Sequence, residues 1–554
     1  MVPDRSDSSA IITSALPYAN GEIHLGHIAS TYLPADIFTR FSRLNGVEAY
    51  HICASDDFGT PILIKAEKEK KTPEDYVAYW NSRDLEDFNS LGVSFDFFYK
   101  TSSKENVKFV QEVFEKLSKN GHIYDQSVIQ FYCTFDEKFL PDRYVIGKCP
   151  YCGAQDQYSD LCESCGRVPD QILEPKCAIC GRPPIRKESK HYFFKLSRFG
   201  QRLRDWLLSN ENLQADLRNY VVNWIDEGLK DWDITRDLSW GVPIPLPEAK
   251  GKVFYGWFDN HLCYISSLIK FVEEKGRDGK EFWNESKIYH FIGKDIVYHH
   301  FLFLPAMRLG INAEYKLPDY IPTRGHLMLQ NQKISKSRNW YIGLRDFTSA
   351  FNPDYLRFYI ASVITYSQAD LNFDFDAFYE RINNELIANV GNFVNRALSF
   401  TQKNYAGQVP EHSQPAGDNV REELAAAVNE AGQLLSRNEI DRALKRILKH
   451  SAFMNQYFQA NAPWANKDTA ATTLYVSVNA VRSLAIMLEP FIPFSCEKIW
   501  SQLNLEGSIH QQKWDSAKDD RAVKPGHRLG RIEPIFRKIE AKEIEQWKER
   551  LGKK

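Results

Sequence analysis

The chain has 554 residues, of which 43% are hydrophobic and 26% charged, and its formal net charge is −2. This composition is typical of a globular protein and excludes a disordered or collagen-like chain. The near-neutral charge neither indicates nor excludes a nucleic-acid partner, because a local basic surface can lie within a neutral average. The length predicts three or four domains, and ten cysteines are the unusual feature of the composition.

The first 124 residues alternate strand and helix patterns. A short apolar run at 11–15 ends at a turn with Pro17 and Gly21, and a helical pattern follows to Arg43. A second strand is predicted at 47–54, and a helix at 103–120 with a serine cap at its start. Such alternation predicts an α/β fold with a Rossmann-like, doubly wound parallel sheet.

The pattern changes at 125–235, where cysteine, glycine and proline concentrate, and this predicts an insertion that splits the α/β fold. Strand and helix patterns resume within 252–309. From about 377 the chain is mainly helical, with amphipathic helices expected at 380–400 and 471–488. The last segment, 541–554, is expected to be a charged helix or tail, and we favour a solvated end. We expect five parts, with bounds at 1–124, 125–235, 236–325, 326–376 and 377–554.

No segment has the roughly 20 uninterrupted apolar residues of a membrane span. The best candidate, 484–494, is short and interrupted by Glu489, Pro490 and Pro493. The polar start MVPDRSDSSA has no apolar core that could serve as a secretory signal. We therefore expect no membrane association and a cytoplasmic location, where clustered cysteines more often bind metal than form disulfides.

Two CxxC pairs, each followed by glycine (Gly153 and Gly166), lie nine residues apart in the insertion. Four thiolates at this spacing predict one tetrahedral Zn²⁺ site, with the ligands Cys149, Cys152, Cys162 and Cys165. Since four protein ligands leave no position for water, the metal is expected to be structural.

A third CxxC pair has no fourth pair to complete it, and the nearest candidate is a Cys-Thr-Phe-Asp segment before the first pair. Carboxylate oxygen is an acceptable zinc ligand, so a second site is predicted at Cys133, Asp136, Cys177 and Cys180. The remaining cysteines, Cys53, Cys263 and Cys496, are expected to be small buried hydrophobes.

Two motifs could bind phosphates. After the first strand, His24 and His27 lie three residues apart around Gly26, where a strand, a turn and a helix start form a natural anion site. The second motif, much later in the chain, is the segment Lys-Ile-Ser-Lys-Ser-Arg, which contains Lys333 and Lys336 and ends with Ser337 and Arg338. Its two lysines suit a loop that binds polyphosphate by charge. Either motif alone is as well explained by ordinary surface residues.

Together, and in this order, the two motifs resemble the HIGH and KMSKS signatures of class I aminoacyl-tRNA synthetases. The resemblance extends over nearly the whole chain to the methionyl-tRNA synthetase family. The resemblance rests on the CxxC insertion and on four further segments: Ala15–His27, Cys53–Pro61, Trp232–Gly241, and Gly293–Asp295 together with His300. It implies a Rossmann catalytic domain in two halves, at 1–124 and 236–325, a connector with the lysine loop at 326–376 and an α-helical anticodon-binding bundle at 377–554.

Members of this family activate methionine with ATP, giving methionyl-adenylate and pyrophosphate, and then esterify the 3′-terminal adenosine of tRNA(Met). The resemblance implies catalytic roles for His24, His27, Lys333 and Lys336. It implies ATP contacts, with Mg²⁺ accompanying ATP, at Gly26, Gly293, Asp295 and Lys336. It implies methionine contacts at Ala15, Leu16, Tyr18, Asp56, Trp257, Tyr264 and His300, with Asp56 pairing with the ammonium group.

The chain departs from the family pattern beside the side-chain pocket. Where the family usually reads WFDAPIGY, Asn260 and His261 replace alanine and proline, and His299 stands where an aromatic residue is common. Polar groups there could reshape the pocket or point away from it, so an adenylating ligase for another amino acid is an alternative. A second alternative is a catalytically silent tRNA-binding paralogue, which the presence of both ATP motifs disfavours.

The helical C-terminal part carries its own signals. Asn392 and Arg396 are four residues apart and share a helix face, and Trp464 follows a second predicted helix. By the resemblance these three positions contact a CAU anticodon. Many family members carry a further C-terminal OB-fold that binds tRNA or dimerises, and since this sequence has no room for one after its helical part, a monomer is expected.

Overall fold

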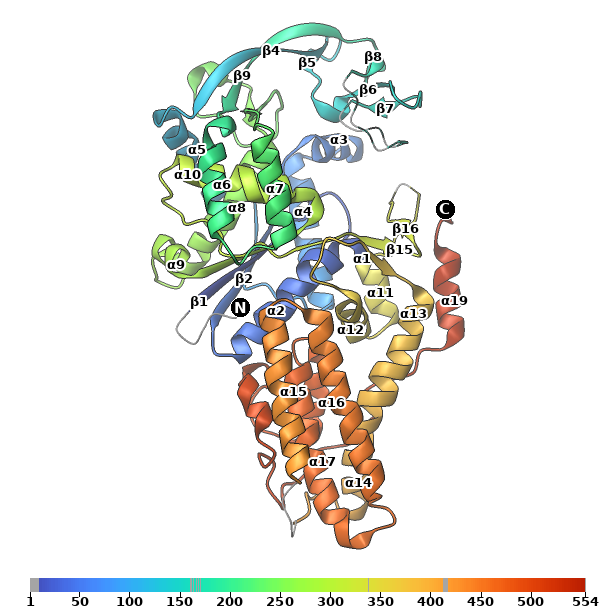
Figure 1. The fold of residues 1–554 in the computed structure, drawn as a ribbon. Helices are drawn as coiled ribbons and strands as arrows, with labels where there is room; N and C mark the ends of the chain where they lie inside the picture. Colours follow the sequence, from blue (N-terminus) through green and yellow to red (C-terminus); the bar gives the residue numbers. More distant parts are fainter. Residues whose placement is uncertain are drawn as a thin grey trace.

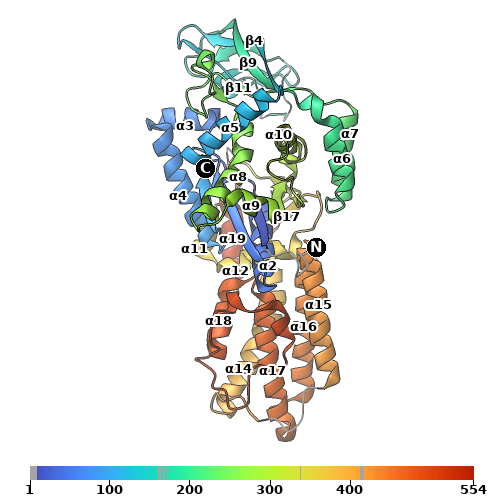
Figure 2. The same ribbon diagram turned by 90° about the vertical axis from the view of Figure 1, so that its left-hand side faces the viewer.

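The computed structural model describes residues 9–553 except 160, 161, 163, 166, 168, 170, 337 and 412–416. Segment 1–8, Gly166 of the second CxxC pair and Ser337 of the lysine motif lie outside the described residues. The molecule is elongated, with an α/β part in the middle, an arch of strands at one end and a helical bundle at the other (Figure 1, Figure 2).

A five-stranded parallel sheet forms the centre of the α/β part. Its strands are β1 (Ser9–Ser14), β2 (Glu48–Ser55), β3 (Phe97–Lys100), β13 (Lys287–Gly293) and β14 (Thr323–Arg324). Their order, β14-β13-β1-β2-β3, shows that the chain moves outward from β1 in both directions. Ligands of such sheets bind outside the carboxyl ends of the strands at the point where the order reverses, which here lies between β1 and β13.

Helices cover both faces of this sheet, as the alternating side chains of β1 demonstrate. Ala10 and Ile12 belong to a hydrophobic cluster with Phe38 of α2 (Leu33–Leu44). Ile11 belongs instead to a cluster with Val110 of α5 (Lys104–Lys119) and residues of α8 (Gly256–Glu273). The sheet is therefore doubly wound, which confirms the predicted fold class.

Shorter elements complete the α/β part. They are α1 (Leu25–His27), η1 (Ile28–Tyr32), α3 (Thr60–Glu69), α4 (Pro73–Ser90), β11 (Thr235–Arg236), η4 (Pro247–Ala249), β12 (Val253–Phe254), α9 (Gly279–Glu285), η5 (Lys294–Ile296), η6 (His299–Phe303) and α10 (Leu304–Gly310). Two of them, η1 and η6, are single π-helical segments. Such turns are frequent at functional sites, and both follow motifs of the predicted site.

An insertion splits the α/β fold after α5, as expected. Its arch pairs β4 (Ile123–Cys133) antiparallel with β9 (Ile185–Phe194), flanked by β5 (Lys138–Phe139) and β10 (Trp232–Asp233). A second sheet, β7-β6-β8, carries the cysteines and consists of β6 (Val145–Lys148), β7 (Gln157–Tyr158) and β8 (Leu173–Cys177). The helical elements of the insertion are η2 (Asp142–Tyr144), η3 (Leu196–Phe199), α6 (Gly200–Ser209) and α7 (Ala215–Asp226).

The lysine motif follows a small hairpin. Its strands, β15 (Leu327–Leu329) and β16 (Gln332–Lys333), form a sheet with β17 (Leu371–Phe373). Two helices, α11 (Leu344–Ala350) and α12 (Pro353–Val363), lie between β16 and β17 in the sequence. The two residues at the turn, Gln330 and Asn331, have φ values of 49° and 59°. Positive φ at both central residues is the geometry of a tight hairpin turn, and it directs the lysine loop back over the cleft described below.

The helical bundle contains α13 (Phe375–Glu380), η7 (Arg381–Gly391), α14 (Asn392–Asn404), α15 (Asp418–Ser436), α16 (Ile440–Asn461), α17 (Lys467–Leu488) and α18 (Pro493–Leu503). The expected helix at 471–488 exists as part of α17, but it is not amphipathic, because every residue from Thr473 to Leu488 is buried. Among the described residues α17 is the one helix long and apolar enough for a membrane span, and 89% of its most apolar window is buried inside the fold.

The chain end is not a solvated tail, contrary to expectation. Residues 504–540 are mostly irregular, with η8 (Ile509–Gln511) and η9 (Trp514–Lys518), and α19 (Ala541–Arg550) follows. Ile544 and Trp547, three residues apart on one face of α19, are buried, and the Trp547 ring lies 6.2 Å from that of Phe347 and 6.1 Å from that of Phe351. Two apolar residues on an otherwise charged helix are enough to dock it beside α13.

Candidate active site

A cleft of about 700 Å³ lies where the strand order reverses. It is lined by the loop between β1 and α1, the start of α8, the segment after β13 and the lysine loop. Nearly all predicted small-molecule contacts line it, namely Ala15, Leu16, Tyr18, His24, Gly26, His27, Asp56, Trp257, Tyr264, Gly293, Asp295, Lys333 and Lys336. His300 does not line the cleft but lies behind it, hydrogen-bonded to Tyr264.

The two histidines of the first motif are stacked, with ring centroids 3.7 Å apart. His24 is the N-cap of α1, and its Nδ1 accepts from Gly26 N at 3.2 Å, while His27 Nδ1 accepts from His24 N at 3.2 Å. Because a backbone N–H only donates, both neutral rings carry their proton on Nε2. Burial lowers the pKa of His24 and, together with the Lys336 charge, lowers that of His27 to about 3. Both rings are thus neutral N–H donors at the cleft.

Gly26 allows the two motifs to pack closely. A Cβ at this position would lie 2.9 Å from Ile334 Cδ1 and 3.0 Å from His24 Cε1. Such distances are shorter than van der Waals contact between carbon atoms. A larger residue would therefore displace the end of the Ile334 side chain or the His24 ring.

Lys336 crosses the cleft to the loop between β1 and α1. Its ammonium donates to the carbonyl oxygen of Glu22 at 2.8 Å, and burial together with the nearby Lys65 ammonium lowers the pKa of Lys336. Lys65 in turn donates to the carbonyl oxygen of Asn20. Two ammonium groups, from the lysine loop and from α3, therefore lie close together at the cleft, an arrangement that favours a polyanionic ligand.

The segment after β13 forms the opposite wall of the cleft. Asp295 Oδ1 lies 3.2 Å from His326 Nε2, and Lys294 pairs with Asp370 at 2.6 Å. A Cβ at Gly293 would lie 2.6 Å from Asp295 Oδ1, so glycine permits this carboxylate to fold back over the strand end. Burial alone would raise the pKa of Asp295. The hydrogen bond and the charge of His326 outweigh this effect, so the pKa of Asp295 is lowered.

Asp56 stands at the end of β2 and faces the same cleft. Its backbone N–H donates to Pro17 O at 2.7 Å, and Asn260 Nδ2 donates to its Oδ2 at 3.2 Å. The second carboxylate oxygen has no hydrogen-bond partner among the described residues. Burial raises the pKa of Asp56 to about 7. A buried carboxylate with a free oxygen is suited to an ammonium group, which would restore its charge.

Aromatic and imidazole rings surround the adjoining part of the cleft. Trp257 stacks on His299 with centroids 3.9 Å apart. Tyr264 Oη and His300 Nε2 are 3.1 Å apart, and His300 Nδ1 lies 3.0 Å from Ile296 O. Since a carbonyl only accepts, His300 carries its proton on Nδ1, and the Tyr264 hydroxyl donates to Nε2. His300 therefore orients Tyr264.

The structure adds residues that the sequence did not indicate. Glu22 anchors the lysine loop through its carbonyl oxygen and accepts from Tyr341 Oη at 2.6 Å. His326 and Asp370 line the cleft, and Lys65 lies beside Lys336. Glu22 stands inside the first motif, so its position was a usable signal. His326 and Asp370 belong to the connector and Lys65 to α3, and no local pattern indicates that these segments approach the cleft.

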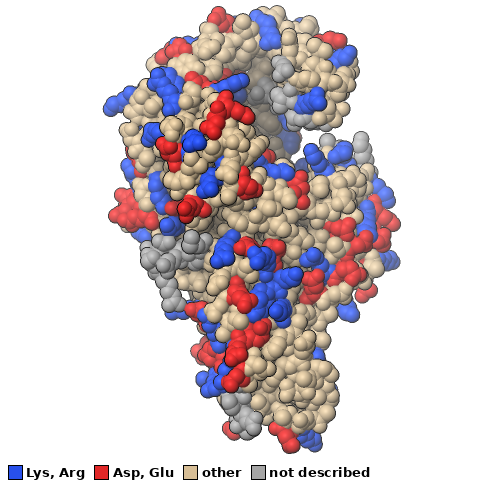
Figure 3. Space-filling view, viewed as in Figure 1, with Lys and Arg blue, Asp and Glu red and all other residues tan. Residues whose placement is uncertain are grey.

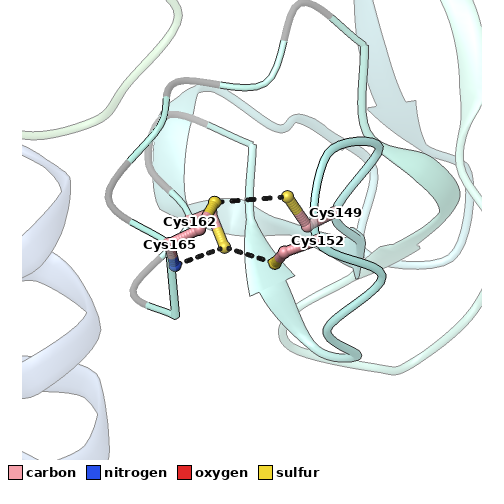
Figure 4. A group of neighbouring side chains, drawn as sticks. All are labelled: Cys149, Cys152, Cys162 and Cys165. Carbon is pink, nitrogen blue, oxygen red and sulfur yellow. Dashed lines mark hydrogen bonds between the residues drawn. The ribbon is translucent and has the colours of Figure 1, made fainter.

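The four cysteines of the first two CxxC pairs point toward one another (Figure 4). The distance from Cys149 Sγ to Cys165 Sγ is 3.9 Å, and that from Cys152 Sγ to Cys162 Sγ is 3.6 Å. A tetrahedral Zn²⁺ with bonds of about 2.3 Å requires sulfur atoms about 3.8 Å apart. The residues present therefore fit a zinc ion.

The proposed second set also converges. The ligand atoms of Cys133, Asp136, Cys177 and Cys180 all lie within 4.8 Å of one another. Asp136 Oδ2 is 3.0 Å from Cys133 Sγ and 3.1 Å from Cys177 Sγ, and Cys133 Sγ is 3.5 Å from Cys180 Sγ. Three sulfur atoms and one carboxylate oxygen match zinc's preferred donors. The other three cysteines are buried, as expected.

The predicted anticodon residues lie at the far end of the bundle. Arg396 of α14 donates to Gln459 Oε1 at 3.0 Å, and its guanidinium lies 5.5 Å from the Trp464 ring centroid. Trp464 is 48% exposed, which is unusual for tryptophan. Asn392 is exposed one turn before Arg396 on α14. Arg396 is thus brought together with Trp464 of the turn after α16, and Asn392 lies on the same face of α14 as Arg396.

Comparisons with known proteins agree with this architecture. Residues 10–398 match the model of the family described as class I tRNA synthetases (M), and residues 409–554 match that of the anticodon-binding domain of methionyl-tRNA ligase. The methionine–tRNA ligase of Methanopyrus kandleri is 42% identical over 549 residues, covering 97% of this chain and 81% of that protein. The chain belongs to the methionine–tRNA ligase family. The methionine–tRNA ligase of Thermococcus kodakarensis is 41% identical, and the match covers 96% of this chain and 74% of that protein.

The fold of the methionine–tRNA ligase family is also found in solved structures. The methionyl-tRNA synthetase of Mycobacterium tuberculosis, described as bound by methionyl-adenylate, superposes with a TM-score of 0.79. It is 23% identical, and the match covers 96% of this chain and 100% of that chain. This likeness concerns the fold, which includes the split sheet and the helical bundle.

Proposed function

We propose that the cleft between β1 and β13 activates methionine with ATP and then transfers it to the 3′-terminal adenosine of tRNA(Met). The observation that carries this proposal is the convergence of a histidine pair, a lysine loop and the Asp56 carboxylate in one cleft. Adenylation of an amino acid needs a phosphate-binding wall and a group that holds the ammonium. Membership of the methionine–tRNA ligase family supplies methionine as the amino acid and tRNA as its acceptor.

Activation needs no nucleophile from the enzyme, because the methionine carboxylate attacks the α-phosphorus of ATP and pyrophosphate leaves. Catalysis is then positioning together with stabilisation of charge on the phosphates. The Nε2–H groups of His24 and His27 donate to the phosphates from one side, and Lys336 with Lys333 closes from the other. Mg²⁺ that enters with ATP offsets the charge that leaves with pyrophosphate.

The other cleft residues orient the two substrates. Gly26 and Gly293 let the nucleotide approach the backbone closely, and Asp295 accepts from a ribose hydroxyl. Asp56 pairs with the methionine ammonium. The methionine side chain lies among Ala15, Leu16, Tyr18, Trp257 and Tyr264, and His300 positions the Tyr264 hydroxyl. Aromatic rings make favourable contacts with a thioether sulfur.

Recognition of tRNA is assigned to the bundle. The exposed Trp464 stacks on a splayed anticodon base, and Asn392 and Arg396 read base edges. A groove of about 670 Å³ between η7 and α16 supports this assignment, since its lining includes Arg381, Arg442, Lys445 and Lys449. Lys and Arg side chains gather on the same face where α15 and α16 approach the α/β part (Figure 3).

The two metal sets hold Zn²⁺ in structural roles. Each uses four protein ligands, which leaves no position for a reacting water. We assign 1–124 and 236–325 to the catalytic domain, 125–235 to the zinc insertion, 326–376 to the connector and 377–554 to the anticodon-binding domain. The monomeric state and the cytoplasmic location expected from the sequence stay predictions.

ATP–pyrophosphate exchange with each of the twenty amino acids, followed by charging of tRNA, tests the proposal. Methionine alone should support exchange, and methionine should then be esterified to tRNA(Met). Trp464→Ala should keep the exchange rate and lose most of the charging, since it changes only the bundle. Exchange with a different amino acid would establish the alternative ligase, and absence of exchange with all twenty would establish the silent paralogue.

A further inference from the structure

The wall of the amino-acid pocket contains a buried polar side chain without a partner. His261 lines the cleft, is 1% exposed, and neither of its ring nitrogens has a hydrogen-bond partner among the described residues. Buried polar groups in folded proteins are nearly always hydrogen-bonded, so each exception requires an explanation. A ligand group that enters the pocket would provide one.

Two of the rings next to His261 are hydrogen-bonded to other groups. Its ring centroid lies 4.7 Å from that of His300, 5.4 Å from that of Trp257 and 6.5 Å from that of Tyr264. The Tyr264 hydroxyl donates to His300 Nε2, and His300 Nδ1–H donates to the carbonyl oxygen of Ile296. Neither proton is therefore directed to His261, and both ring nitrogens of His261 stay unpaired among the described residues.

The protonation state of His261 follows from its surroundings. Burial, the neighbouring imidazoles of His300, His299 and His290, and the Arg308 guanidinium lower the pKa of His261 well below its ordinary value. The ring is therefore neutral near pH 7 and presents one N–H donor. His290 is occupied elsewhere, since its Nε2 lies 3.2 Å from Arg308 Nη2 and its Nδ1 lies 2.5 Å from Thr13 Oγ1.

We propose that His261 donates a hydrogen bond to the thioether sulfur of methionine and so sets the selectivity of the pocket against all-carbon side chains of the same shape. The inference rests on the proposed function. The sulfur is the one acceptor on the methionine side chain, although a weak one. Norleucine, with a methylene in place of sulfur, leaves the His261 N–H unpaired in a buried site, and a site built to donate rejects such an analogue.

The test compares kcat/KM for L-methionine and L-norleucine in ATP–pyrophosphate exchange. His261→Phe keeps a ring and removes the donor, so the preference for methionine should fall by about 5- to 10-fold, the scale of one weak hydrogen bond. His261→Gln restores an N–H and should keep the preference within about 2-fold of the original. The change should appear mainly in KM, because the contact is the same in the ground and transition states.

His299→Phe is the matched control. This neighbouring histidine stacks on Trp257 and does not line the cleft, so its replacement should leave the methionine-to-norleucine ratio unchanged. An unchanged ratio in His261→Phe overturns the inference, and so does an equal fall of the ratio in His299→Phe. If His261→Phe does not fold, His261→Leu takes its place with the same expectation.

The outcomes separate this inference from the proposed function. If the unmodified protein does not activate methionine, the proposed function itself fails. If it activates methionine but binds methionine and norleucine equally well in an assay that follows intrinsic tryptophan fluorescence, only the role of His261 fails. A preference for methionine that His261→Phe abolishes and His261→Gln retains establishes it.

Discussion

Single side chains in the cleft have protonation states set by their immediate partners. Backbone donors hold the Nδ1 atoms of His24 and His27, so both rings present Nε2–H to the cleft. Neutral imidazoles donate to phosphates without the cost of burying two further charges beside Lys336. Their types and spacing were visible in the sequence, but their tautomers follow from contacts that only the folded loop provides.

We expect the carboxylate of Asp56 to make methionine binding depend on pH. Its folded pKa of about 7 lies above the ordinary 3.8, so the folded state retains a proton that the unfolded chain has lost. Stability therefore falls as pH rises from about 4 to 7, while the ionised carboxylate needed for the ammonium appears only near and above pH 7. The KM for methionine in pyrophosphate exchange should decrease as pH rises from 6 to 8.

Asp56→Asn separates the two effects of this carboxylate. It should be more stable than the unmodified protein to urea at pH 8 and should have a KM for methionine raised by at least about 10-fold, since a buried charged hydrogen bond is lost. A KM that does not change with pH would contradict the assignment of Asp56 to the ammonium group.

Lys336 should act in the transition state of activation. If its ammonium stabilises charge on the phosphates, Lys336→Ala should slow pyrophosphate exchange by about 10²- to 10³-fold, the usual effect of losing one such donor. Arg338→Ala removes a positive charge from the same loop and should lose far less. Equal rates for Lys336→Ala and the unmodified protein would refute this role.

At the scale of elements, close packing joins motifs that are far apart in the sequence. The helix start at His24 forms an isolated antiparallel bridge with Gly343, and Gly26 admits Ile334 of the lysine loop. The π-helical segment η1 directly follows His27. The second π-helical segment, η6, contains His299 and His300. Helix and strand patterns predicted these elements within a few residues, whereas the π turns have no pattern of their own, because they reflect tertiary packing.

The insertion should hold two zinc ions per chain. Metal analysis of the purified protein should find about two, and Asp136→Ala should reduce this toward one by removing a ligand of the second set only. Cys177→Ser should have the same effect, while Cys165→Ser should empty the first set instead. A content of one zinc, unchanged in Cys177→Ser, would show that the second set does not bind metal.

At the scale of the whole molecule, a buried ionic network joins the catalytic part to the bundle. Arg357 of α12 is fully buried and donates to Asp36 Oδ2 at 2.7 Å and to the carbonyl oxygen of Pro490 at 2.8 Å. Arg40 of α2 pairs with Asp36 at 2.9 Å and with Glu489 at 2.8 Å. Three segments from different parts of the chain are thereby held in one arrangement, which links the cleft to the anticodon end.

Breaking this network should be costly. Arg357→Leu leaves the Asp36 carboxylate buried with one partner fewer, and the loss of one member of a buried ion pair costs about 3–5 kcal/mol. The free energy of unfolding in urea should fall by that amount. Arg442→Leu, which removes an exposed partner of Glu439 on the bundle, should change it by less than about 1 kcal/mol. Similar values for both variants would contradict a structural role for the network.

The sequence by itself determined the order of the elements, the two converging sets of candidate metal ligands and the identity of most residues that line the cleft. These depend on local chemistry: strand and helix periodicity, CxxC spacing, and histidines or lysines in short motifs. Only the tertiary structure decided that α17 lies at the centre of the bundle, that Ile544 and Trp547 dock the chain end, and that Lys336 meets Glu22 across 314 positions. Burial and partners across such distances arise from packing of the whole chain, which no local pattern encodes.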